Sequence, residues 1–495
     1  MHTPGRTLLP PRTPVLVGVG TSAESAPLCE LMVAASTAAA HDAGVPDLLR
    51  SVERIHLTQG SWSLGDPVRA VAPRIGAPGA LSVRFEVGVS QQEVIDHALH
   101  LISTGEADAI LVLGGEARAY ERKEGGSGHG DGCDDGEDSV PDVTVTRPPD
   151  FVHPVEVAAG IVWPPIQQYA LIENALGAHE HVDPVALREQ VAALWARFNA
   201  VAADNPDAAF GSALTASDIA TPSARNRPLA YPYNRWHSSQ WTVDQASALV
   251  FCSAQKAADA GVPADRYVFP RVALHSSAAV TLTARRDLFA WPAMEVLGRL
   301  ASDHLGQPLA EISLVEIYSC FPAAVRVQQR ALGLDMEGTP TLTGGMAFAG
   351  GPFNHYVLAA TAVMARRLRH EPDSLGLVTT VSGMLSKPGL AVWSARPAGA
   401  DEGPLMADVA DQATAATATV PVAAPTDGGA ATVASYTVTF DPDEPLVPAR
   451  VAVVADLADG SRTAATCQDR STAQEALRHG LIGAGIHVAH STFTL

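Results

Sequence analysis

Several protein classes are disfavoured by what this sequence lacks. It has only 5 cysteines in 495 residues, none in a Cys-x-x-Cys pair, so neither a disulfide scaffold nor a cysteine-type zinc site is predicted. No run approaches the roughly 20 apolar residues that cross a bilayer, and the N-terminus has no signal-peptide core. The net charge of −20, without any basic run, argues against nucleic-acid binding. We therefore expect a soluble, cytoplasmic protein with no membrane span and no nucleic-acid partner.

What the sequence does contain is the composition of a large globular protein. Hydrophobic residues make up 47% and charged residues 17%, which is enough to build a sizeable core. Short apolar runs alternate with segments of helical periodicity. The predicted strands and helices of the first part are Val15–Gly20, Pro27–Gly44, Val52–Leu57, Gln91–Gly105 and Ala109–Leu113. This alternation predicts an α/β fold with a mostly parallel, buried sheet.

The same order of elements recurs later in the chain. The predicted elements there are a helix, a strand, a helix and a strand, at Pro292–Leu305, Leu314–Tyr318, Tyr356–Arg369 and Gly376–Val381. A Gly-x-Pro stop precedes the strand by 11 residues in both places, from Gly44 to Ile55 and from Gly306 to Ile317. We interpret this spacing as an internal duplication.

Composition also divides the chain into segments. We predict two α/β halves at residues 1–285 and 286–400, a linker rich in Ala, Thr and Pro at 401–432, and a β-rich domain at 433–495. Within the first half, Glu121–Asp142 is rich in Gly, Asp and Glu and is predicted to be a solvated surface loop. Metal binding by His129, Asp131, Cys133 and Asp134 is the less favoured alternative, so no metal site is predicted.

Three segments carry residues that could take part in catalysis or ligand binding. Gly88 and Ser90 precede a helix whose Ser90-x-x-Glu93 pattern predicts a capping box, and a nucleophilic Ser90 would need a base that is not visible nearby. Cys320 follows a predicted strand at the sheet edge where ligands bind, although a buried, inert thiol is the favoured interpretation.

The glycine-rich run from Gly344 to His355 is the duplicate of the Gly88 loop. There Asn354 and His355 could act as hydrogen-bond donor and base, or Asn354 could cap the following helix.

These segments, taken in order, resemble the thiolase superfamily. The matching stretches are PVLVGVG, GVSQQ, LISTGEADAILVLGGEA, PPIQQYALIENAL, NRPLAYPYNRWHSSQWTVDQASALVFCSA, VEIYSCFPAAV, GGMAFAGGPFNHY and VTTVSGMLSKPGLAVWSARP, over residues 12–397. Within that superfamily the sequence is most similar to the actinobacterial thiolase-like proteins of type 1. These are often labelled acetyl-CoA acetyltransferase and carry an additional C-terminal domain. The resemblance implies two duplicated βαβαβαββ halves in five α-β-α-β-α layers, followed by a small OB-like barrel.

The resemblance also implies where catalytic residues should stand. The nucleophilic cysteine of thiolases falls on Gly88, and the Asn or His of the N-E-A-F or H-D-C-F loop falls on Tyr318. The histidine of the G-H-P loop falls on Gly351, and the second cysteine falls on Val381, or on Ser382 with a one-residue slip. Without these side chains, thiolysis and Claisen condensation by the usual covalent route should fail.

Three functions stay open from the sequence. The first is an acyl-CoA or acyl-thioester binding protein of lipid metabolism, inactive in thiolysis and without a bound cofactor. The second is an acyltransferase or C–C lyase that uses a different residue set, with His355, Tyr318, Ser90 and Cys320 as candidates. The third is a structural or scaffolding subunit. The predicted ligand pocket comprises Gly88, Ser90, Tyr318, Gly350, Gly351, Asn354, His355 and Ser382.

The oligomeric state stays open as well. The resemblance implies a homodimer formed through the core strand before the Gly88 loop. Here that strand carries the charged residues Arg84 and Glu86, which weaken the prediction of a dimer and leave a monomer as the alternative.

Overall fold

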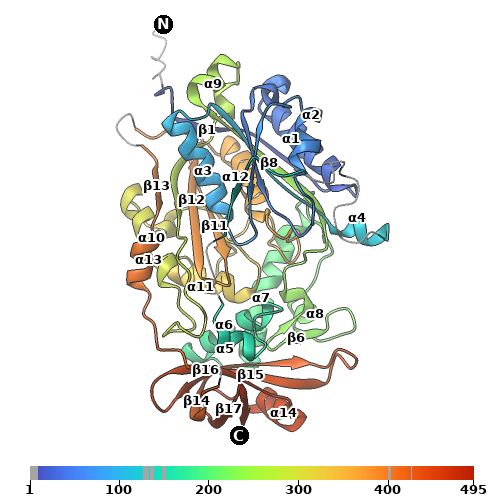
Figure 1. Ribbon diagram of the computed structural model, residues 1–495, viewed down its shortest axis with the longest axis vertical. Coiled ribbons are helices and arrows are strands. Elements are labelled where there is room, and N and C mark those ends of the chain that lie inside the picture. Colours follow the sequence, from blue (N-terminus) through green and yellow to red (C-terminus); the bar gives the residue numbers. More distant parts are fainter. Residues whose placement is uncertain (1–8, 126–132, 134–138, 148–151, 400–402, 425) are drawn as a thin grey trace.

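The computed structural model describes residues 9–125, 133, 139–147, 152–399, 403–424 and 426–495. Figure 1 shows a large layered core and, below it in red, a smaller domain built from the last strands of the chain. None of the described helices combines the length and apolar character that crossing a bilayer requires.

The first sheet of the core has six strands. In spatial order they are β1 (Pro14–Ser22), β8 (Asp244–Ser253), β4 (Ala109–Ala117), β2 (Arg54–Thr58), β3 (Leu81–Phe85) and β5 (Val143–Val145). Every residue of β4 is buried, because helices cover both faces of the sheet.

The second sheet repeats the arrangement of the first. Its order is β10 (Leu314–Glu316), β11 (Leu375–Ser382), β12 (Lys387–Ser394), β9 (Phe269–His275) and β13 (Leu405–Asp408). The neighbours β9–β12–β11–β10 pair as antiparallel, antiparallel and parallel. The neighbours β1–β8–β4–β2 pair in the same sequence. The predicted duplication is therefore confirmed at the level of topology.

Helices form the other three layers of the core. The central layer holds α3 (Gln91–Thr104), which packs against β4 and β9, and α12 (Tyr356–His370), which packs against β8 and β11. The outer layers hold α1 (Leu28–Asp42) and α2 (Val68–Arg74) on one side, and α10 (Pro292–Leu305) and α11 (Pro322–Leu332) on the other. A central helix is covered from both sides, which explains why the polar residues Gln91, Gln92 and Asp96 of α3 are buried along with its apolar ones.

A long insertion separates β4 from β8. Its helices are α4 (Arg118–Lys123), α5 (Pro154–Ala158), α6 (Ile166–His179), α7 (Pro184–Ala203) and α8 (Ala216–Ala220), and α9 (Ala254–Asp259) follows β8. Two short strands, β6 (Pro228–Ala230) and β7 (Tyr233–Asn234), form a hairpin. Helix α6 is buried over most of its length and packs against both α11 and the C-terminal domain.

The C-terminal domain is a closed barrel of five strands. These are β14 (Gly429–Phe440), β15 (Pro448–Leu457), β16 (Arg462–Cys467), β18 (Thr492–Thr494) and β17 (Gly485–Ala489), and β14 pairs with both β15 and β17. Helix α14 (Arg470–His479) packs on it. The core hairpin β6–β7 extends the same sheet, because Ala230 pairs with Thr439 of β14.

The segment between core and barrel differs from the predicted linker. Residues 401–432 contain β13, which pairs with β9, and helix α13 (Ala410–Ala416), which packs on α10. Their apolar residues Leu405, Met406 and Ala413 cover the core. Strand β9 already belongs to the second sheet, although the boundary between the halves was predicted at 285/286.

Two cysteines pair, contrary to the prediction. Cys29 at the start of α1 and Cys133 form a disulfide. They lie 104 residues apart in sequence, and only the folded chain brings them together. The alternative of metal binding by Cys133 is thereby disfavoured, and His129, Asp131 and Asp134 lie outside the described residues.

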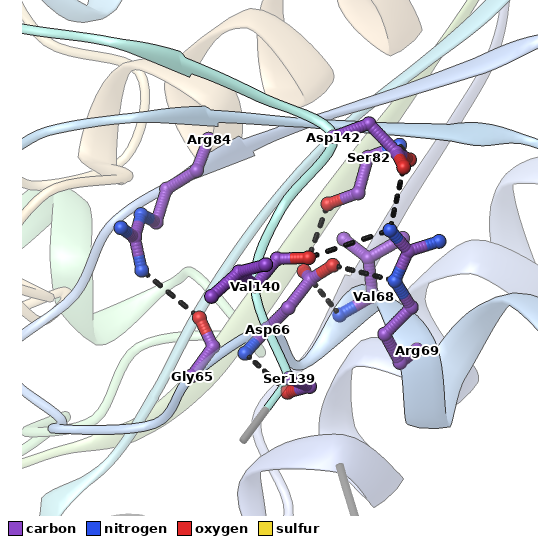
Figure 2. A network of polar contacts seen from close by, with 9 residues as sticks. All are labelled: Gly65, Asp66, Val68, Arg69, Ser82, Arg84, Ser139, Val140 and Asp142. Atoms are coloured by element: carbon purple, nitrogen blue, oxygen red, sulfur yellow. Dashed lines mark hydrogen bonds and ion pairs between the residues drawn. The ribbon is translucent and has the colours of Figure 1, made fainter. Parts of the chain in front are cut away.

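The edge of β3 that does not pair with β2 is covered by another segment of the same chain. Strand β5 pairs with β3 in parallel, and the Asp142 carboxylate accepts hydrogen bonds from the Ser82 amide (2.8 Å) and the Arg69 guanidinium (2.7 Å). Arg84 donates to the carbonyl oxygen of Gly65 (2.9 Å), and Glu86 accepts from the backbone amide of Arg147 (3.1 Å). Figure 2 shows the contacts around Asp66 and Asp142, together with the hydrogen bond between Arg84 and Gly65. The charges of Arg84 and Glu86 thus help to hold segments that pack at the edge of β3.

Candidate functional site

The main cavity of the molecule lies where the core meets the barrel. It has a volume of about 890 Å³, within the range of ligand-binding pockets. Its wall comes from the loops that follow the core strands, the segment 162–169 at the start of α6, the segments 227–229 and 238–241, and the hairpin between β14 and β15 with Arg450. Most lining side chains are apolar or aromatic.

The loop at Gly88 enters the cavity between β3 and α3. Gly88 has a φ of +105°, which a residue with a side chain adopts only with strain. Its carbonyl oxygen accepts hydrogen bonds from the Lys387 ammonium group and from the Ser382 hydroxyl (3.3 Å). Ser382 therefore ties the β11–β12 turn to the Gly88 loop, and both residues line the cavity.

Ser90 does not play its predicted part. It is the N-cap residue of α3, but its hydroxyl makes no capping hydrogen bond. The hydroxyl is buried without a hydrogen-bond partner in the described part of the chain, and Ser90 does not line the cavity. The neighbouring Gln91 does line it, and its side-chain oxygen accepts from the Val357 amide of α12 (2.8 Å).

Tyr318 and Cys320 follow β10 and line the cavity together. The Tyr318 ring packs edge-on against Tyr356, with centroids 5.8 Å apart, and burial raises its pKa above the ordinary value. Burial also raises the pKa of the Cys320 thiol to about 12, although its hydrogen bond with the Tyr169 hydroxyl acts in the opposite direction. A thiol of that pKa stays protonated at neutral pH and is a poor nucleophile.

The loop around Gly351 is held by hydrogen bonds to Glu316, and the Ser239 side chain occupies the space next to Gly351. The buried Glu316 carboxylate accepts from the Leu342 and Thr343 amides (2.6 and 2.9 Å) and from the Tyr356 hydroxyl (2.6 Å), which holds the start of the glycine-rich run. On the other side, a Cβ added to Gly351 would lie 1.9 Å from the Ser239 hydroxyl oxygen. There is no room for a side chain at this position unless Ser239 moves.

The segment containing Ser239 connects two of these loops. The Ser239 amide donates to the Cys320 carbonyl oxygen (3.0 Å), and the Gln240 amide donates to the Met346 carbonyl oxygen (3.0 Å). The Gly351 amide in turn donates to the Gln240 carbonyl oxygen (3.0 Å). Ser238 and Ser239 therefore form a fixed part of the cavity wall.

Two further predicted pocket residues lie outside the main cavity. His355 is 1% exposed and does not line it; burial lowers its pKa to about 3, and Nε2 has no hydrogen-bond partner in the described part of the chain. Gly350 lines a separate small pocket beside Gln245. Asn354 does line the main cavity, but it donates to the Gln59 carbonyl oxygen (3.0 Å) and does not cap α12, whose N-cap residue is His355.

Sequence reasoning missed the aromatic rim and the barrel side of the cavity. Trp163 and Trp241 are 65% and 37% exposed, with rings 6.5 Å apart, and both line the cavity. The Arg118 guanidinium lies 3.9 Å from the centre of the Trp241 ring. Phe440 and Arg450 come from the barrel. The sequence does not mark these residues as part of a cavity wall, because the exposure of the tryptophans becomes visible only in the fold.

Comparisons with known proteins agree with this architecture. A family model for the additional C-terminal domain of thiolase-like protein type 1 matches residues 408–492. The crystal structure of a monomeric SCP2-thiolase like protein type 1 from Mycobacterium smegmatis matches over 99% of this chain and 100% of its own, with a TM-score of 0.82 and 28% sequence identity. The chain has the thiolase fold, followed by the additional C-terminal domain of thiolase-like protein type 1.

More distant members share the thiolase fold. The dimeric peroxisomal thiolase of Saccharomyces cerevisiae has a TM-score of 0.53 and 14% identity, over 78% of this chain and 98% of its own. An Ltp2-ChsH2(DUF35) aldolase has a TM-score of 0.58 and 18% identity, over 78% of this chain and 99% of its own. A search of curated proteins finds no match.

The thiolase fold brings four distant positions to one place. Gly88, Tyr318, Gly351 and Val381, which the resemblance aligns with the catalytic positions of thiolases, all line the main cavity. Of the residues predicted to form a ligand pocket, Gly88, Tyr318, Gly351, Asn354 and Ser382 line this cavity, and Ser90, Gly350 and His355 do not.

Proposed function

We propose that this thiolase-like protein binds an acyl-CoA or another acyl thioester in the main cavity and does not catalyse thiolysis or Claisen condensation. The observation that carries the proposal is the geometry at Gly351. The space that a catalytic histidine would occupy there is filled by the Ser239 hydroxyl, 1.9 Å from an added Cβ. The site is thus rebuilt around the missing side chain, while a cavity of ligand size is kept.

The remaining candidates do not supply a substitute catalytic set. Cys320 has a pKa of about 12, and His355 has a pKa of about 3 and lies outside the cavity. A thiolate and a base within reach of one substrate are what acyl transfer by a covalent route requires. These properties favour binding over the acyltransferase or lyase alternative.

We further propose that the ligand is used in lipid metabolism in the cytoplasm and that the protein is a monomer. The mostly apolar cavity suits an acyl chain, and β5 occupies the edge of β3. In a reducing cytoplasm the Cys29–Cys133 disulfide would open, so the proposal requires that the reduced protein binds its ligand as well.

Calorimetric titration tests binding. Decanoyl-CoA is added to the full chain, to Val162→Trp, which fills the cavity wall, and to Val185→Trp, which is on an exposed surface away from it. We expect binding to the native protein and to Val185→Trp, and its loss in Val162→Trp. No heat at millimolar decanoyl-CoA would contradict the proposal.

An activity assay tests the second part. We expect no thiolysis of acetoacetyl-CoA above the uncatalysed rate. Clear turnover that disappears in Cys320→Ala or His355→Ala would show that a different catalytic set operates and would favour the acyltransferase alternative.

A further inference from the structure

The barrel is a fixed part of the cavity wall. Thr439, Phe440, Asp441, Pro442 and Pro445 of the β14–β15 hairpin line the cavity, as does Arg450 of β15. The barrel is held to the core at this place by buried polar contacts. The Asn174 amide group of α6 donates to the carbonyl oxygens of Tyr231 (3.1 Å) and Tyr436 (2.8 Å).

The charge of the cavity wall is opposite to the charge of the whole protein. The protein carries a net charge of −20, yet the ionisable groups of the wall other than Tyr and Cys are Arg227, Arg450 and Asp441. The Asp441 carboxylate forms an ion pair with Arg470 (2.8 Å) and accepts from the amides of Asp443 and Glu444 (2.9 and 3.2 Å). Its charge is therefore compensated, and the two arginines leave the wall positive.

Arg450 has only neutral partners. Its Nη2 donates to the Gly160 carbonyl oxygen (3.2 Å) and to the Gln167 side-chain oxygen. In the described part of the chain no carboxylate pairs with it, and its Nε and Nη1 have no hydrogen-bond partner. Just over half of the other arginines in the described chain form an ion pair with a carboxylate, as Arg326 does with Glu173 and Arg369 with Asp42. A partly buried guanidinium without a counter-charge favours an anion beside it.

We propose that the barrel supplies the head-group end of the ligand site. Arg450, assisted by Arg227, binds the anionic group of an amphipathic ligand whose apolar part occupies the aromatic side of the cavity. The identification of that ligand as a CoA thioester rests on the function proposed above. The anion itself is a phosphate or a carboxylate, which are the groups that a guanidinium binds with two parallel hydrogen bonds.

Ligands of equal chain length and different head groups test this assignment. Decanoyl-CoA, decanoate and the uncharged decanoyl-pantetheine are titrated into the full chain and into Arg450→Gln, Arg450→Lys and Arg478→Gln. Arg478 is an exposed arginine of α14 away from the cavity and serves as the control. Thermal unfolding of each variant is measured in parallel.

We expect Arg450→Gln to weaken binding of the anionic ligand about tenfold, the loss of one charge-assisted contact. Decanoyl-pantetheine should bind native protein and Arg450→Gln equally. Arg450→Lys should retain part of the affinity, and Arg478→Gln all of it. If only decanoyl-CoA responds, the head group is phosphate; if decanoate responds too, the site accepts a carboxylate.

Two results would overturn the proposal. One is decanoyl-CoA binding that is the same in Arg450→Gln as in the native protein, which would leave the proposed function intact. The other is an equal loss for charged and uncharged ligands, which would show that Arg450 only supports the 160–167 segment. Conversely, decanoate binding that depends on Arg450, without any decanoyl-CoA binding, would contradict the proposed function and support the head-group site.

Discussion

At the scale of single residues, the contact between Gly351 and Ser239 decides whether this site can hold the side chain of a thiolase. Gly351 does not have a positive φ, so the backbone there allows any residue. The main obstacle to a side chain is the Ser239 hydroxyl oxygen, 1.9 Å from an added Cβ, and the Met346 carbonyl oxygen lies 3.1 Å from it. Any side chain at position 351 would therefore require the Ser239 side chain to move.

Gly351→Ala should therefore lower the free energy of unfolding by about 1–3 kcal/mol, the usual cost of overpacking. Ser239→Gly in the same chain should restore most of it, and chemical denaturation of both single variants and the double variant measures the coupling. Gly79→Ala is the control, because nothing lies within 4 Å of an added Cβ there. Equal stability of Gly351→Ala and Gly79→Ala would contradict the assignment.

Glu116 is a residue whose ionisation opposes folding. It is 1% exposed and accepts hydrogen bonds from the Ser61 amide and hydroxyl (2.7 Å each). Burial raises its pKa to about 7, and the Ser61 hydrogen bonds offset this in part. Because the folded state holds this proton more tightly than the unfolded chain does, its contribution to stability is present at low pH and is lost as the pH rises from about 4.5 through 7.

Glu116→Gln should remove this pH dependence. Relative to the native protein, the variant should gain up to about 3 kcal/mol between pH 5 and pH 8, the value of a shift of roughly two and a half pKa units. Urea unfolding at several pH values measures the difference. Glu106→Gln, at an exposed position, should show no such trend, and a parallel pH profile for Glu116→Gln would refute the prediction.

At the scale of elements, β5 covers the edge of the first sheet by pairing with β3. It contains three residues, too few to form a stable strand alone. It is held by the ion pair of Asp142 with Arg69 and by the Ser139 hydroxyl, which accepts from the Asp66 amide (2.9 Å). A short strand secured by side chains protects an edge that would otherwise pair with another chain.

Asp142→Ala should loosen this edge selectively. Hydrogen exchange should become faster at the amides of β3 and β5 and stay unchanged in β4, since the lost contacts lie only at the edge. Asp373→Ala, which removes an exposed ion pair with Arg396, is the matched control. If the amides of β3 and β5 exchange at the same rate in Asp142→Ala as in the native protein, β5 is held by its backbone alone.

Short elements of this kind were also beyond prediction from sequence. The long periodic elements were predicted closely: α10 has the predicted bounds, and α3 and α12 differ from them by one residue. β5 and β13 have no periodicity of their own and form because a sheet edge is present. Ser90 matches a capping pattern in the sequence, but in the folded chain its hydroxyl is buried and makes no capping hydrogen bond.

At the scale of the whole molecule, the Cys29–Cys133 disulfide links α1 to the segment that leads to β5. It closes a loop of about 100 residues, and a crosslink of that span stabilises a protein by about 2–5 kcal/mol. Reduction, or Cys133→Ser, should lower the unfolding free energy by that amount. Cys467→Ser, at a free and partly exposed cysteine, should have little effect, and no response of the native protein to reductant would contradict the prediction.

Some residues of the candidate site could be predicted from local sequence patterns, and others become apparent only in the complete fold. Gly88, Tyr318 and Gly351 could be placed in one pocket because each follows a recognisable element and the halves are duplicated. Trp163, Phe440 and Arg450 could not, because their segments reach the cavity only through the contact of α6 and β6 with the barrel. That contact joins residues more than 200 positions apart, as Asn174 and Tyr436 are.

The dependence of the cavity on the barrel has a consequence for how the protein is made. Ribosomes add about 5–20 residues per second to a growing chain, and the N-terminal parts of the chain fold first. The core strands precede the barrel strands in the chain, so the ligand site stays open on one side until the barrel has been made. A nascent chain therefore has a complete binding site only after the barrel strands have been made and have folded against the core.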